Sequence, residues 1–219
     1  ERTRRYIKEF SLKLSLFSKE IFEKLIRLGF PTALQLFFEV TAFAGAAFIC
    51  GLISAKDIAS HQIALSMASF TFNLCVGFSV ASTVMIGRKL GEKDFVNLEK
   101  VGFNNLKIAF LFMLMCGIFF ILGRNILPTF FTKKEDIEVI KLASKLMIIA
   151  ALFQLSDGIQ VTALGCLRGI QDVKIPSILT FIAYWVITIP LGYYLCFVLK
   201  MGAFGMWRSE ERRVGKECL

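Results

Sequence analysis

Two carboxylic acids, Glu39 and Asp157, stand inside stretches of sequence that otherwise carry almost no charge. Glu39 follows Gly29 by 10 residues, and Asp157 precedes Arg168 by 11. At the rise of an α-helix, about 1.5 Å per residue, each acid would lie roughly 15 Å inside an apolar segment. A charge at the centre of a bilayer costs about 2.5–3.5 kcal/mol or more, so it normally faces inward and is used. We expect a cation-coupling pair that holds a proton or binds Na⁺ and exchanges it for a cationic compound; the alternative is a protonated pair that serves packing.

Nearby polar and aromatic residues could line the same cavity and contact a substrate or an ion: Gln35, Asn73, Phe153, Gln154 and Gln160. Each amide is weak evidence by itself, because amides in membrane bundles often only hydrogen-bond between helices. His61 and Gln62 lie near the start of another apolar segment. There we expect packing, with a proton relay as the alternative.

The composition indicates the elements that must position these residues. Of 219 residues, 56% are hydrophobic, 23 are Phe, and the mean hydropathy is +0.65. Charges gather in short blocks between apolar runs of about 20 residues, which is the length of a helix that crosses a bilayer. Only a helix or a closed barrel satisfies its own backbone in lipid. We therefore predict an all-α polytopic membrane protein with five transmembrane helices, at about 28–53, 58–86, 106–122, 139–167 and 176–199.

The ends of the chain differ from this domain of residues 28–207. Residues 1–27 are basic, and Ile21, Phe22 and Leu25 share one helical face, which predicts a cytoplasmic segment with a short interfacial helix before a turn at Gly29 and Pro31. Residues 208–219 read RSEERRVGKECL, and eleven of them match the translation of a common sequencing adapter. We therefore expect this tail to be an artefact and exclude it from the fold.

The loop charges predict an orientation and exclude several functions. Fourteen Lys and Arg residues fall in 1–27, 88–100 and 168–174, against six in the opposite loops, so the first group is expected to be cytoplasmic. The net charge of +9 does not indicate nucleic-acid binding, because the basic residues alternate with spans. Six scattered Cys support neither a disulfide framework nor a zinc site, and nothing indicates a cofactor.

Several segments resemble the multidrug and toxic compound extrusion (MATE) family, in its bacterial cation-coupled branch. They read LGFPTALQLFFEVTAFA (28–44), ASHQIALSMASFTFNL (59–74), ASTVMIGRKLGEKD (81–94), FQLSDGIQVTALGCLRGIQDVKIPSI (153–178) and YWVITIPLGYYL (184–195). The resemblance implies twelve helices in two six-helix lobes. This chain would hold helices seven to eleven, as a fragment of the C-terminal lobe, with the N-terminal lobe and helix twelve outside it.

The resemblance also implies roles for individual residues. Glu39 matches an acid on helix seven of the family and Asp157 an acid on helix ten, both implicated in Na⁺ or H⁺ coupling and both Na⁺ ligands if sodium is used. Phe153 stands where some sodium-linked members have Tyr, so the coupling ion stays open. The segment GRKLGEKD is similar to the family's cytoplasmic turn after helix eight, with a role in topology and gating.

The expected function is a Na⁺- or H⁺-coupled antiporter of the bacterial cytoplasmic membrane that exports small organic cations or amphiphilic drugs. Its partners would be the bilayer and the missing N-terminal lobe. A flippase for lipid-linked saccharides is the alternative, but it would favour basic rather than acidic residues in the spans. An intramembrane enzyme would need a nucleophile or metal-ligand cluster, which one His and scattered Cys do not supply, and a channel would need a filter-like loop.

Overall fold

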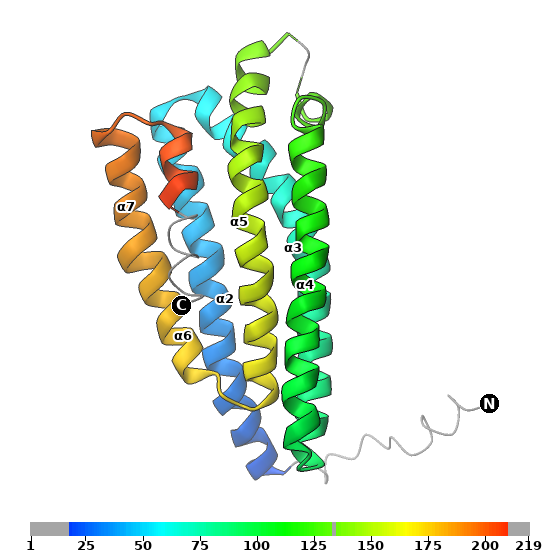
Figure 1. Ribbon diagram of the computed structural model, residues 1–219. Helices are drawn as coiled ribbons and strands as arrows, with labels where there is room; N and C mark the ends of the chain where they lie inside the picture. The colour runs from blue at the N-terminus through cyan, green and yellow to red at the C-terminus, as the bar shows by residue number, and fades with distance from the viewer. Residues whose placement is uncertain (1–17, 133–134, 210–219) are drawn as a thin grey trace, which may run out of the picture.

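The computed structural model describes residues 18–132 and 135–209, and in this part of the chain the secondary structure is helical, without strands. The elements are α2 (Lys19–Ile53), α3 (Ala55–Gly91), α4 (Phe95–Gly123), η2 (Leu127–Phe130), α5 (Ile137–Gly169), α6 (Lys174–Phe181), η3 (Ile182–Thr188), α7 (Ile189–Tyr193) and η4 (Tyr194–Val198). The last four form one rod, and the rod and the four long helices are each long and apolar enough to cross a membrane. The predicted all-α fold with five spans is therefore confirmed (Figure 1).

The first helix corrects one prediction. Residues 19–27 belong to α2 and continue into the first span without a break, so the predicted turn at Gly29 and Pro31 is wrong. A proline is tolerated inside a spanning helix where neighbouring helices and hydroxyl side chains satisfy the backbone. The Ser177 hydroxyl, from α6, also donates to the Pro31 carbonyl oxygen at 2.8 Å, which ties α6 to α2 at this point. Residues 1–17 of the basic segment lie outside the described residues, as do residues 210–219 of the expected artefact.

The fifth span changes its helix type around a second proline. Pro190 cannot donate a backbone hydrogen bond, and the turns before and after α7 have π geometry, as η3 and η4. The Thr188 hydroxyl donates to the Ala183 carbonyl, five residues earlier, at 2.9 Å. Local π turns of this kind re-satisfy the groups that a proline frees.

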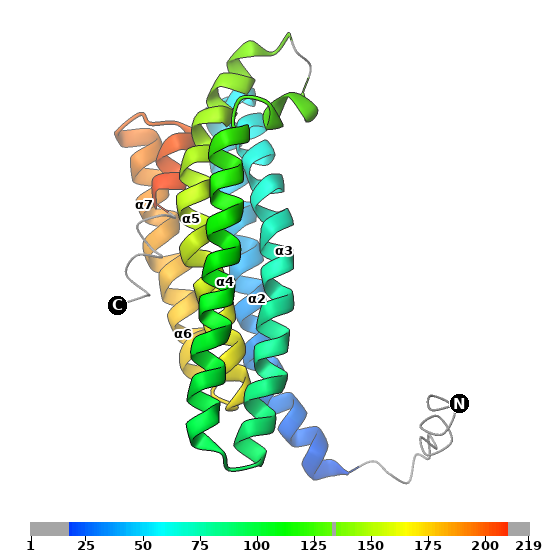
Figure 2. The same cartoon turned by 45° about the vertical axis from the view of Figure 1, so that its right-hand side comes forward.

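The helices pack in two groups that share α3. α5 packs against α3 and α4, whereas α2 packs against α3 and against the fifth span (Figures 1 and 2). α2 and α5 make hardly any direct backbone contact with each other. The seam between α3 and α5 is built from small residues: Ser79 donates to the Val161 carbonyl at 2.6 Å and Thr83 to that of Gly165 at 2.8 Å. Such small and hydroxyl residues allow close helix approach in a membrane.

In the described part of the chain, the turns and helix ends that are rich in Lys and Arg lie together at one end of the bundle. The start of α2, the α3–α4 turn and the α5–α6 turn all lie at this end, which we call the basic end (Figure 1).

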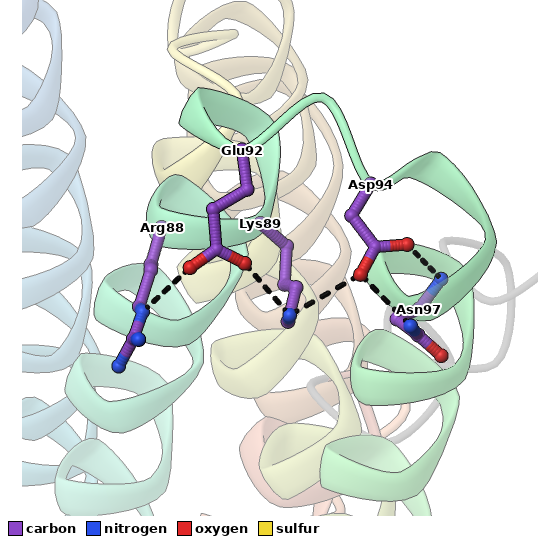
Figure 3. A network of polar contacts seen from close by, with 5 residues as sticks. All are labelled: Arg88, Lys89, Glu92, Asp94 and Asn97. Carbon is purple, nitrogen blue, oxygen red and sulfur yellow. Dashed lines mark hydrogen bonds and ion pairs between the residues drawn. The ribbon is translucent and has the colours of Figure 1, made fainter.

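A compact polar network holds the α3–α4 turn (Figure 3). Glu92 accepts from Lys89 at 2.8 Å and from Arg88 at 2.9 Å, and these bonds lower the pKa of the Glu92 carboxyl. Asp94 caps α4 by accepting from the side-chain and backbone nitrogens of Asn97, and its pKa is lowered in turn. The segment GRKLGEKD thus forms a self-contained turn.

Candidate functional site

A cavity of about 290 Å³ opens between α2, α3 and α5. Its lining is mostly apolar, with two acids and two small polar residues: Leu36, Glu39, Val40, Phe43, Leu65, Ala68, Ser69, Phe72, Asn73, Phe153, Asp157 and Trp207. Glu39 is half-buried, and Asp157 is buried with 6% of its surface exposed. Both acids therefore face a space large enough for a small molecule, with low polarity around them.

A second cavity of about 100 Å³ continues toward the basic end. It is lined by Leu36, Glu39, Phe72, Val76, Asp157, Gln160, Val161, Leu164 and Arg168. Glu39 and Asp157 belong to both linings, so the acid pair lies where the two cavities meet. A group that moved between the cavities would pass the two carboxylates.

Close packing behind α5 fixes the direction of Asp157. The next residue, Gly158, faces α4 and α3, where an added Cβ would lie 2.5 Å from the Met113 side chain of α4 and 3.2 Å from the Cys75 sulfur of α3. Neighbouring residues on a helix point about 100° apart. The tight contact at Gly158 therefore holds the Asp157 side chain on the cavity side.

Aromatic rings close the larger cavity at the end away from Arg168. Phe153 packs edge-to-face on Trp207, with ring centroids 6.1 Å apart and planes at 89°. The Trp207 indole nitrogen donates to His61 Nδ1 at 3.1 Å, and His61 is fully buried. His61 thus supports the cavity wall from behind without lining it, and Gln62 lies exposed beside a separate surface groove.

Two of the predicted polar residues line the cavities. Asn73, on α3, lines the larger one, and its side-chain nitrogen donates to the Ser69 carbonyl at 2.8 Å. Gln160 lines the smaller one, and its buried Oε1 has no hydrogen-bond partner among residues 18–132 and 135–209. Together with the carboxylates, these side chains offer oxygen ligands of the kind that hard cations prefer.

The other two amides, Gln35 and Gln154, are not among the residues that line these two cavities. Gln35 donates to the Thr180 hydroxyl at 3.2 Å, and Gln154 accepts from the Thr71 hydroxyl at 2.9 Å. A residue four positions away on a helix is rotated by about 40°, and one three positions away by about 60°. That rotation turns Gln35 from Glu39 toward α6, and Gln154 from Asp157 toward α3.

Sequence reasoning missed Arg168, which it counted only as a loop charge. The side chain lines the smaller cavity with both acids, and its Nη2 donates to Gln35 Oε1 at 3.5 Å. Arg168 follows Asp157 by eleven residues, about three full turns, so the two share a helix face. That spacing is the signal in the sequence that could have found it.

The donor set limits which ions the site fits. Within the described part of the chain, no three His, Cys, Asp or Glu residues gather closely enough to hold a metal ion. The two carboxylates and the amide oxygens form a sparse set compared with the six to eight ligands that Ca²⁺ takes. The arrangement suits a proton or a weakly held monovalent cation.

A bundle of five spanning helices with an acid pair on a shared cavity defines a multi-pass helical membrane protein with a polar site between its helices. The MatE family model matches residues 31–194, which is most of the chain, and the protein belongs to this family.

Relatives support this membership. The chain is 38% identical over 188 residues to the multidrug resistance protein NorM of Photobacterium profundum, with 84% of this chain and 41% of that protein covered. It is 36% identical over 210 residues to the probable multidrug resistance protein NorM of Pasteurella multocida, with 94% and 45% covered. The chain therefore spans less than half the length of these relatives.

Solved structures share the fold. A eukaryotic MATE transporter superposes with a TM-score of 0.84 at 19% identity, over 95% of this chain and 48% of that one. A MOP superfamily transporter from Pyrococcus furiosus, described as having a binding pocket of reversed polarity, superposes with a TM-score of 0.78 at 15% identity, over 88% and 42%.

Proposed function

We propose that this chain is part of a cation-coupled exporter of organic, often positively charged, compounds. The observation that carries the proposal is that Glu39 and Asp157, on different helices, line both of two adjacent cavities between α2, α3 and α5. A carboxylate pair there can hold either a proton or Na⁺, or a cationic compound, but not all of them at once. Competing occupants of one negative pocket are what an antiporter requires.

The shape and chemistry of the larger cavity support the kind of compound proposed. Its volume of about 290 Å³ is near the lower limit for small-molecule sites. Phe43, Phe72 and Phe153 offer flat apolar surface next to the two acids. Aromatic faces attract organic cations, with about 0.5–2 kcal/mol for each good contact.

Transport itself belongs to the longer protein in this proposal, because the chain covers only 40–45% of the relatives' length. Alternating access would come from rocking one set of helices against another around a fixed site. The basic end would face the cytoplasm of a bacterial cell, following the preference of Lys and Arg for cytoplasmic loops.

The test uses full-length protein containing these residues, reconstituted in liposomes, with ethidium as the transported cation. Glu39→Gln and Asp157→Asn should each abolish export driven by an imposed Na⁺ or proton gradient, at unchanged expression. Glu99→Gln, an exposed acid on α4, is the matched control and should export normally. Normal gradient-driven export by both cavity variants would refute the proposal.

The flippase alternative gains one observation, since Arg168 places a basic side chain in the smaller cavity. The two acids still outnumber it there, and the larger cavity contains acids without a basic residue. An anionic lipid-linked saccharide would be repelled by this lining. The geometry therefore favours export of cations.

A further inference from the structure

Arg168, on α5, and Glu39, on α2, approach one another from two antiparallel helices. Side chains on a helix tilt toward its N-terminus. α5 enters from the end opposite the basic end, so Arg168 tilts inward toward the level of Asp157 (Figure 1). α2 begins at the basic end, so Glu39 tilts toward Arg168.

The surroundings of Arg168 leave its charge incompletely compensated. Its guanidinium lies close enough to Glu39 for an electrostatic interaction, and its Nη2 donates a long bond of 3.5 Å to Gln35 Oε1. Its Nε is buried and has no hydrogen-bond partner in the described part of the chain. An Arg side chain keeps its charge under all ordinary conditions. A buried hydrogen-bond donor without a partner costs free energy, which favours movement of the Arg168 guanidinium onto a better acceptor.

We propose that Arg168 is a resident counter-ion that competes with the coupling cation for Glu39. This inference rests on the proposed function of the acid pair. When no cation is bound, the guanidinium compensates the Glu39 carboxylate; when a cation enters, the guanidinium withdraws onto the Gln35 oxygen, one helical turn away.

Competition from Arg168 would allow the bound cation to be released in each transport cycle, which every coupled transporter requires. A bare acid pair in an apolar cavity would hold its cation too tightly to release it on every cycle. A built-in positive charge lowers the affinity and stabilises the ion-free state, which must form before the protein can return. Coupling between two such groups typically changes affinity by about 5–150-fold.

The test measures the half-saturating concentration of the coupling ion for ethidium export by the full-length protein, with Na⁺ at fixed pH and with protons in Na⁺-free buffer. Arg168→Gln should lower this concentration by about tenfold or more and slow the maximal rate. Arg168→Lys keeps the charge and should stay within about threefold of the unchanged protein. Arg27→Gln removes a positive charge from an exposed position of α2 at the same end and should change nothing.

A second variant separates this role from a merely structural one. Gln35→Met removes the alternative acceptor of the guanidinium, so Arg168 should compete more strongly and the half-saturating concentration should rise. Shifts of opposite sign cannot come from general damage to the fold, and Gln35→Met keeps the proposal testable if Arg168→Gln does not fold. Unchanged half-saturation in Arg168→Gln or in Gln35→Met would overturn the inference. If Glu39→Gln still showed ion-driven export, the proposed function itself would fail instead.

Discussion

Gly165 lies at a tight contact between α3 and α5, and replacing it with alanine tests whether this seam holds the bundle together. A Cβ built there would overlap the Ser79 carbonyl oxygen and lie 2.5 Å from the Ser79 hydroxyl. Most of the obstruction is backbone, which cannot rotate away as a long side chain can. The two helices would have to move apart by about 1 Å to reach an ordinary contact distance.

The cost follows from these contacts. Overpacking a tight site costs about 1–3 kcal/mol. Separation would also lengthen the bonds from Ser79 to Val161 and from Thr83 to Gly165, and interhelical bonds in membranes contribute about 0.6 kcal/mol each. Alanine regains up to about 1 kcal/mol through its better helix propensity. We expect a net loss of about 1–3 kcal/mol, which corresponds to a melting temperature lower by roughly 2–12 °C.

Thermal unfolding of the purified protein in detergent measures this loss. Gly29→Ala is the matched control, because no atom lies within 4 Å of a Cβ built at Gly29 and only the propensity gain should remain. Gly165→Ala should therefore melt well below the control. Equal melting temperatures for the two variants would show that α3 and α5 are not packed as closely as described.

Two further predictions concern the ends of the bundle. Asp57 accepts from Ser54 and from the Ala203 backbone nitrogen at 2.8 Å, so Asp57→Ala should lose about 1 kcal/mol or more in the same melting assay; unchanged melting would contradict this. Because their pKa values are lowered in the folded turn, Glu92 and Asp94 stabilise it fully above about pH 5 and lose this effect as the pH falls through the lowered values. Hydrogen exchange of the α3–α4 turn, corrected for intrinsic rates, should thus stay constant from pH 7 to 5 and rise as the pH falls further, and exchange that does not rise down to the lowest pH at which the bundle stays folded would argue against the network.

The number and approximate positions of the helices could be predicted because one physical quantity, the thickness of the bilayer, sets their length. The thickness of a bilayer sets the length of each apolar run, so five runs gave five helices. Counting residues from the ends of those runs put Glu39 and Asp157 at similar depth, and the structure has both on the same cavities. Depth needs only the rise of a helix and no knowledge of its neighbours.

The faces of the helices were harder to predict, because they depend on which helices are adjacent. Gln35 and Gln154 lie within one turn of an acid, yet each turns toward a hydroxyl on another helix. Arg168 has a long side chain whose charged group can lie far from its backbone. Its position at the end of an apolar run therefore did not show that the guanidinium reaches the cavity. Pro31 lacks a backbone N–H and therefore predicts a break in the helix, but α2 continues through it in the structure.

The uneven packing of α2 against α5 has a mechanical consequence. Toward the end opposite the basic end, residues of α2, α3 and α5 share one tight core with Trp207, including Ala46, Ala64 and Ala150. Toward the basic end the space between α2 and α5 is occupied by the cavities instead. The shared core can therefore act as a pivot about which α2 rotates relative to α5. A small tilt of α2 about this core would change the distance between the two carboxylates, while the seam between α3 and α5 would stay as it is.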